Sequence, residues 1–249
     1  MTMTTLCSKC GFNNPPGMRF CGNCGAQLSD TVAPPPTTPT SDTISPQMGA
    51  MMGADLLERF RQAGMAAAGQ RRNVTVLFVD LSGYTQLAEK LDSEDLYDLI
   101  QQYIEILAND VYKYEGMVDK FTGDGLMALF GAPIAHENNA ELAVRSALDM
   151  IADVDQLSQK LKESLGVELR VHIGLNAGSV IVGGIGSNLL MNYTAIGDTV
   201  NLAQRLEDSA PAGNVFVSDS VYRQTQALFD YVPSPTLRLK GIARPIHGH

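Results

Sequence analysis

The stretch that most constrains the fold runs from Val74 to Phe130 and reads as a strand, a helix and a tight hairpin. It opens with VTVLFV, an almost wholly apolar and β-branched run, which predicts a strand buried on both faces and ending at Asp80. Two more β-rich runs, 116–121 and 126–130, flank a Gly-Asp-Gly turn. This turn favours a hairpin with Asp124 at its tip.

The two aspartates of this stretch predict a metal site. A carboxylate at a buried strand end is costly unless it is paired or binds a metal. Carboxylates are hard oxygen ligands of the kind that Mg²⁺ or Mn²⁺ takes, usually together with substrate phosphates. Taken singly, Asp80 reads as a helix N-cap and Asp124 as a turn residue. Taken together, they favour a cation between them.

Composition and charge exclude several classes of partner. The 249 residues carry a net charge of −9 and are 45% hydrophobic, which allows a substantial core but argues against nucleic acid, which requires a basic face. No window reaches the roughly 18 apolar residues of a membrane span, and the N-terminus lacks an apolar signal region. We therefore expect a cytoplasmic protein with no membrane span in this chain.

Four cysteines form two CxxC pairs, each followed by glycine. Four thiolates at this spacing are typical of a closed tetrahedral Zn²⁺ site. A redox CxxC would need a βαβ context that is missing here, and disulfides are disfavoured in the cytosol. We predict structural Zn²⁺, which the short ribbon needs in order to fold, bound by Cys7, Cys10, Cys21 and Cys24.

The chain divides by composition into four segments. Residues 1–28 form the predicted zinc ribbon, and residues 29–53 are a linker rich in Pro, Thr and Ser. Residues 54–70 have one apolar stripe and predict a connecting helix, which either packs locally or serves as a dimer or signalling contact. Residues 71–249 form the large domain.

The large domain continues with alternating helical and strand patterns. Core-facing helices are predicted for two segments, 93–114 and 138–165. Strands are predicted for 169–176 and 179–185, joined near Gly178, and His172 within the first reads as a packed histidine. A further helix begins at about Gly197. It carries Asn201 and Arg205, which are four residues apart and so share one face. That face is either simply solvated or suited to phosphate, which arginine binds in bidentate fashion.

Three ordered motifs carry a family resemblance: FVDLSGYT, DKFTGDGLMALFG and YTAIGDTVNLAQRLE. They resemble those of class III nucleotidyl cyclases, from about Arg71 to the C-terminus. The resemblance implies an α+β fold, with a ferredoxin-like βαββαβ core and extra strands. The most similar subclass includes bacterial multidomain and mammalian soluble adenylyl cyclases, some of which respond to bicarbonate.

The resemblance also implies roles for individual residues in making 3′,5′-cyclic AMP and pyrophosphate from ATP. Asp80 and Asp124 would hold two Mg²⁺ or Mn²⁺ ions per site. Asn201 would orient the ribose, and Arg205 would act where charge develops on the phosphoryl oxygens. The base would be chosen by Lys120 and Thr194, and the triphosphate would be contacted by Lys240.

The resemblance further implies a homodimer with two composite active sites. Lys120 and Asp124 would lie about 13 Å apart on an extended strand, a long reach for groups holding one nucleotide. In the family, the two aspartates of one chain face the other site residues of the partner chain. The chain stops where a final strand is still expected, so we anticipate a longer protein with further regulatory domains beyond residue 249.

Other readings remain open. A guanylyl cyclase is disfavoured by Lys120 and Thr194, and a diguanylate cyclase or polymerase palm lacks the TVNLAQR helix. From a different class, the chain could be a catalytically weak or silent nucleotide-sensing module. The partner of the ribbon is not indicated by the sequence.

Overall fold

In the computed structural model, the described residues are 5–7, 9–14, 21, 23–24, 69–187, 190–232 and 248, without the side chains of residues 5, 86 and 184–192. The chain divides into two compact units, Met1–Thr40 and Ser41–His249. The predicted linker, the connecting helix up to residue 68 and the last predicted hairpin with Lys240 lie outside the described residues. None of the helices in the described part of the chain combines the length and apolar character needed to cross a bilayer.

The larger unit is built on one sheet with strand order β4-β5-β3-β6-β7. All neighbouring pairs along this path are antiparallel, and β8 pairs in parallel with the first half of β6. The first four strands in chain order, β3 to β6, alternate with helices as βαββαβ, so the ferredoxin-like α+β core is confirmed. The strands are β3 (Gln70–Ser82), β4 (Met117–Phe121), β5 (Leu126–Phe130), β6 (Arg170–Ser187), β7 (Leu190–Ile196) and β8 (Asn214–Val217).

Strand β3 is central and is buried on both faces, as its apolar sequence predicts. Its odd-numbered residues, such as Leu77 and Val79, pack into the larger core cluster with the long helices. Its even-numbered residues, such as Val76 and Phe78, pack into a second cluster on the other face. Because side chains of a strand alternate between faces, one apolar strand supplies residues to both cores. Burial of each large apolar side chain stabilises the fold by about 1.5–3 kcal/mol.

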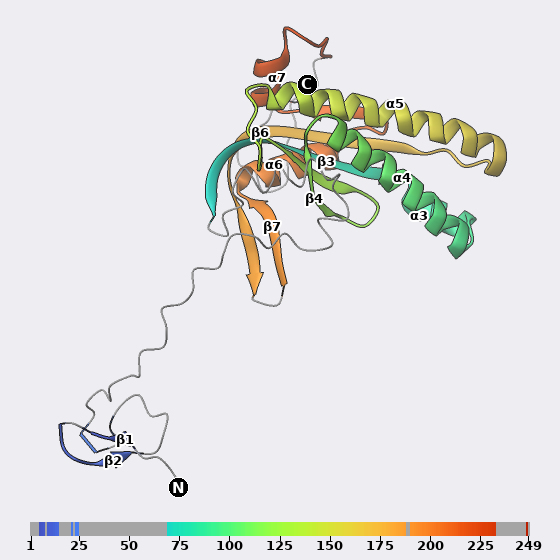
Figure 1. Ribbon diagram of the computed structural model, residues 1–249. Coiled ribbons are helices and arrows are strands. Elements are labelled where there is room, and N and C mark those ends of the chain that lie inside the picture. The colour runs from blue at the N-terminus through green and yellow to red at the C-terminus, as the bar shows by residue number, and fades with distance from the viewer. Residues whose placement is uncertain are drawn as a thin grey trace. The chain divides into compact units, whose positions relative to one another are not determined.

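Helices cover both faces of the sheet. Figure 1 shows α4 (Ser93–Lys113) and α5 (Asn139–Leu165) packed beside one another, close to the predicted ranges, and together they cover one face. The Asp92 carboxylate caps α4 by accepting hydrogen bonds from two backbone N–H groups of its first turn. The other described helices are shorter: α3 (Tyr84–Lys90), α6 (Asp198–Ser209) and α7 (Asp219–Thr225).

Helix α6 lies on the opposite face and approaches β6 closely. Its Ala203 belongs to the second core cluster. A Cβ added at Gly174 of β6 would collide with the backbone of Ala203 and Glu207. A residue with a side chain at this position would push the helix away from the sheet, so Gly174 sets the distance between them.

Two details of the strands differ from the sequence prediction. The predicted break near Gly178 is wrong, because β6 runs without interruption and pairs with β3 through Gly178, opposite Val74. This glycine makes room for the Thr199 side chain rather than turning the chain. Strand β3 also continues two residues past Asp80, which places this carboxylate inside the ladder rather than at its end.

The smaller unit contains one short antiparallel pair, β1 (Thr5–Leu6) and β2 (Asn13–Asn14). These strands bring the first CxxC pair into a tight turn, in which the N–H of Gly11 donates to the carbonyl of Cys7. Gly11 has a φ of 71°, which favours glycine. Cys7 and Cys21 are the buried apolar residues of this unit among those described.

Candidate active site and zinc site

The two predicted metal ligands lie close together. Asp80 is held near the end of β3, and Asp124 lies in the β4–β5 turn, which is closed by a hydrogen bond from the Thr122 N–H to the Gly125 carbonyl. A Cβ on Gly125 would collide with the Val79 carbonyl and lie 2.7 Å from Asp80 Oδ1. The tip of the hairpin therefore rests directly against the end of β3, and glycine is what allows it.

The environment of this pair favours a bound cation. Burial, and then the neighbouring Asp124 carboxylate, raise the pKa of Asp80 to about 6. Asp80 Oδ1 is buried and has no hydrogen-bond partner among the described residues. An unpartnered carboxylate oxygen beside a second carboxylate is costly without a counter-ion, so the residues present fit a divalent cation.

Two groups beside Asp80 were not predicted as part of the site. His172, which read as a packed histidine, lies opposite Asp80 in the β3–β6 ladder, and its Nδ1 is 3.2 Å from Glu207 Oε1. The ligand atoms of Asp80, His172 and Glu207 lie within 4.8 Å of one another. Burial and nearby carboxylates, those of Asp208, Asp80 and Asp124, raise the pKa of Glu207 to about 8. The site thus extends from the end of β3 to the end of α6.

The two predicted base-selecting residues also meet. Lys120 Nζ on β4 is 3.1 Å from Thr194 Oγ1 on β7, although 74 residues separate them. The Lys120 side chain is half exposed. Both groups also contact Asp119, a fully buried carboxylate that the sequence did not single out.

Helix α6 carries Asn201 and Arg205, as predicted. The helix begins at Asp198 after Gly197, close to the expected start. Asn201 is exposed and Arg205 is half-buried. Within the described residues, no hydrogen bond or ion pair joins the aspartate pair to either residue or to Lys120 and Thr194.

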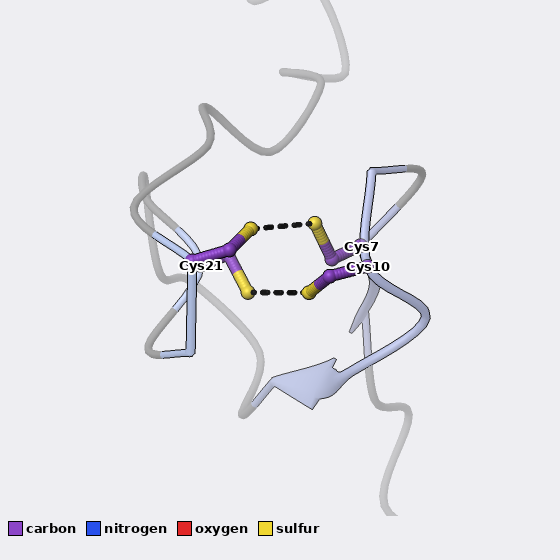
Figure 2. Close-up of side chains that lie close together, drawn as sticks. Cys7, Cys10 and Cys21 are labelled. Carbon is purple, nitrogen blue, oxygen red and sulfur yellow. Dashed lines mark hydrogen bonds between the residues drawn. The ribbon is translucent and has the colours of Figure 1, made fainter.

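The four cysteines of the smaller unit gather as a zinc site requires (Figure 2). The Sγ atoms of Cys7 and Cys24 are 3.7 Å apart, and those of Cys10 and Cys21 are 3.6 Å apart. A tetrahedron with Zn–S bonds of about 2.3 Å has edges of about 3.8 Å, whereas a disulfide needs about 2.05 Å. These separations fit four thiolates around one Zn²⁺ ion and exclude disulfides.

The environment of the Cys21 thiol also favours the thiolate form that binds metal. Burial raises its pKa, but hydrogen bonds, among them one from the backbone N–H of Asn23, outweigh burial and lower the pKa to about 6. The Asn23 nitrogen lies 3.4 Å from Cys21 Sγ. Zinc binds the thiolate, so a donor aimed at the sulfur supports the metal-bound form.

Comparison with known proteins agrees with this geometry. The model of the adenylate and guanylate cyclase catalytic domain matches residues 66–247, and a zinc-ribbon domain model matches residues 6–28. Adenylate cyclase 1 of Rhizobium meliloti is 30% identical over 176 residues, which cover 70% of this chain and 26% of that protein. The chain thus spans about a quarter of this curated relative.

Two solved structures are similar to the larger unit. The adenylyl cyclase CyaB of P. aeruginosa is 33% identical with a TM-score of 0.71, and the match covers 73% of this chain and 94% of that one. The guanylyl cyclase Cya2 is 32% identical with a TM-score of 0.67, covering 72% and 91%. Overall similarity therefore does not separate the two base specificities. The chain belongs to the family of adenylate and guanylate cyclase catalytic domains over residues 66–247, with a zinc-ribbon domain before it.

Proposed function

We propose that this protein is an adenylate cyclase, which converts ATP to 3′,5′-cyclic AMP and pyrophosphate. The observation that carries the proposal is the contact between Lys120 and Thr194. A lysine ammonium has only protons to donate. Adenine presents an acceptor at N1, whereas guanine presents an N–H there. With Lys120 facing N1, as the cyclase resemblance implies, its ammonium would pair with adenine and would meet the N–H of guanine.

The aspartate pair supplies the metal-binding part of the site. Asp80 and Asp124 would hold Mg²⁺ or Mn²⁺, which lowers the pKa of the ribose 3′-hydroxyl and neutralises the triphosphate when bound. The unpartnered Oδ1 of Asp80 supports this assignment. Two ions per site, as in two-metal phosphoryl transfer, are part of the proposal.

The remaining residues act on the ribose and the phosphates. Asn201 orients the ribose so that its 3′-oxygen is in line with the α-phosphorus. Arg205 stabilises the charge that develops on the phosphoryl oxygens during the attack. Lys240 is proposed to contact the triphosphate.

A homodimer would complete two such sites. The aspartates of one chain would face the base-selecting and α6 residues of its partner. This fits the absence of hydrogen bonds and ion pairs between these sets among the described residues of one chain. Ile181 and Ile196 are register partners on β6 and β7, and both are exposed, at 44% and 55%. Apolar side chains that face water across neighbouring strands support a surface that associates with a second copy.

The setting of the enzyme is also part of the proposal. We expect a cytoplasmic protein that makes cyclic AMP for intracellular signalling. Threonine at the second base-selecting position resembles the pattern of the soluble-type subclass, some of whose members respond to bicarbonate, which makes bicarbonate a candidate regulator. Further regulatory domains beyond residue 249 would be in keeping with the length of the curated relative.

The function is tested by measuring products from ATP and from GTP, with Mg²⁺ or Mn²⁺, with and without bicarbonate. Wild type and Asp98→Ala, a change on the exposed surface of α4, should both make cyclic AMP, and Asp80→Ala should not. Cyclic GMP as the main product would overturn the base assignment. Tight nucleotide binding with no cyclic product under any condition would favour the sensing module.

A further inference from the structure

The base-selecting pair rests on a buried carboxylate that has no role in the proposed mechanism. Asp119 lies at a β-bulge, because the β4–β5 register shifts between Val118 and Lys120. Neighbouring residues of a regular strand point to opposite faces, but a bulge breaks this alternation. The side chains of Asp119 and Lys120 therefore both reach Thr194 on β7.

The contacts of Asp119 identify it as a hydrogen-bond acceptor. Its Oδ2 is 3.0 Å from Lys120 Nζ, and its Oδ1 accepts from the backbone N–H of Ala195 at 3.2 Å. An ammonium and a backbone amide have only protons to give. Each carboxylate oxygen thus faces a group that only donates. These contacts favour the ionised carboxylate, whereas burial raises the pKa of Asp119.

This arrangement fixes the direction of the Thr194 hydroxyl. Thr194 Oγ1 is 2.8 Å from Asp119 Oδ2 and donates its single proton there. A threonine hydroxyl has one proton and two lone pairs, and without a fixed partner it could donate or accept toward a ligand. Because the Thr194 hydroxyl donates its proton in the hydrogen bond to Asp119, only its lone pairs are available to the base.

The lysine is restricted in the complementary way. Lys120 has three N–H groups, of which one points to Asp119 and one to Thr194. The pair therefore presents one donor and one acceptor side by side. With Lys120 facing N1 and Thr194 facing C6, as the cyclase resemblance implies, adenine offers the matching edge, an acceptor at N1 and an amino donor at C6. Guanine has a donor at N1 and an acceptor at C6.

We infer that Asp119 is a positioning residue for base selection, which turns Thr194 into an acceptor for the 6-amino group of adenine. The inference rests on the proposed adenylate cyclase activity. Asp119 does not touch the substrate, because its side chain is fully buried beneath the two residues that do. Its contribution is to remove the ambiguity of a hydroxyl that would otherwise suit either base.

The test compares kcat/KM for ATP and for inosine triphosphate, whose base carries the same 6-oxo and N1–H groups as guanine. In Asp119→Asn, the amide nitrogen can donate to Thr194 and leave the hydroxyl free to donate to a 6-oxo group. The ratio of kcat/KM for ATP over inosine triphosphate should fall about tenfold, within the range that a bidentate base contact contributes. Thr194→Ser keeps the hydroxyl and should keep the wild-type ratio.

A structural role alone would lower both values of kcat/KM in proportion. An unchanged ratio in folded Asp119→Asn would therefore overturn the inference, while the production of cyclic AMP by wild type would still uphold the proposed function. A wild type that prefers GTP would instead defeat the proposed function itself.

A second measurement needs no variant and tests the acceptor role of Thr194, on which the inference about Asp119 depends. Purine riboside triphosphate keeps the N1 acceptor but lacks the 6-amino group. If Thr194 accepts from that group, wild type should use this analogue at least about fivefold less efficiently than ATP, the lower end of what such a contact contributes. Equal use of the two nucleotides would overturn the inference.

Discussion

Replacing Asp80 with asparagine should stabilise the protein when no divalent cation is bound. Asn has nearly the same shape but carries no charge. Burial and the Asp124 carboxylate raise the pKa of Asp80 from 3.8 to about 6. At about 1.36 kcal/mol per pKa unit, the charged form costs about 3 kcal/mol in the folded state. Because the side chain is only half-buried, water and salt screen the interaction, and we expect about 1.5 kcal/mol.

The sign and the pH range follow from the direction of this shift. Below about pH 4 Asp80 is protonated in the folded and the unfolded chain, so the variant gains nothing. Between about pH 4 and pH 6 the unfolded chain releases the proton while the folded one keeps it, and wild type loses stability. The advantage of Asp80→Asn is therefore complete above about pH 6.5.

The assay is thermal unfolding in buffer freed of divalent cations over a chelating resin. For a domain of this size, about 1.5 kcal/mol corresponds to a rise in Tm of about 3–6 °C at pH 7.5. The difference should vanish at pH 4. Added Mn²⁺ should raise the Tm of wild type more than that of the variant, because the cation binds the folded carboxylates.

Asp98→Asn on the exposed surface of α4 is the matched control and should leave the Tm within about 1 °C. A lower Tm for Asp80→Asn at pH 7.5, or the same gain at pH 4, would refute the electrostatic argument.

Three further predictions concern other parts of the molecule. Gly125→Ala should lower activity at least about tenfold, because the added Cβ would push the hairpin tip away from Asp80. Gly166→Ala, at the end of α5, is the control, and it should cost about 1 kcal/mol of stability but little activity. Equal activity losses in the two would contradict this. Burial raises the pKa of Glu207 to about 8, so wild type loses stability as the pH rises from 5 to 9. The Tm of Glu207→Gln minus that of wild type should therefore increase over this range, and a decrease would contradict the argument. Purified protein should hold about one zinc per chain and Cys21→Ser much less, measured by metal analysis; equal zinc would contradict the four-thiolate site.

The sequence predicted the elements of the fold well where they depend on local pattern. The apolar run of β3 and the stripe of α4 predicted burial because neighbouring residues alone set those periods. Gly178 misled because glycine usually marks a break, while here it makes room for Thr199 within a continuous strand.

The candidate site was predicted only in part, for a physical reason. Asp80 and Asp124 stand out because a carboxylate beside a buried strand is costly. Asp119 does not stand out, since regular alternation would place it on the face opposite Lys120, and its partner Thr194 is 75 residues away. The bulge and the pairing of β4 near β7 are tertiary features that no local pattern reveals.

The same holds for the pair behind Asp80. His172 lies in an ordinary strand pattern, and Glu207 lies in an ordinary helix, 35 residues apart. Only the β3–β6 register and the close approach of α6 at Gly174 bring them to the Asp80 carboxylate.

The central claim is that one chain supplies both halves of an active site that forms only between two chains. Asp80→Ala and Asn201→Ala, co-expressed with different tags and purified as the heterodimer, test it most directly. Each variant alone should be inactive. The heterodimer should regain about half of the wild-type cyclic AMP production, because one of its two composite sites is intact. A heterodimer that forms but makes no cyclic AMP would contradict the account.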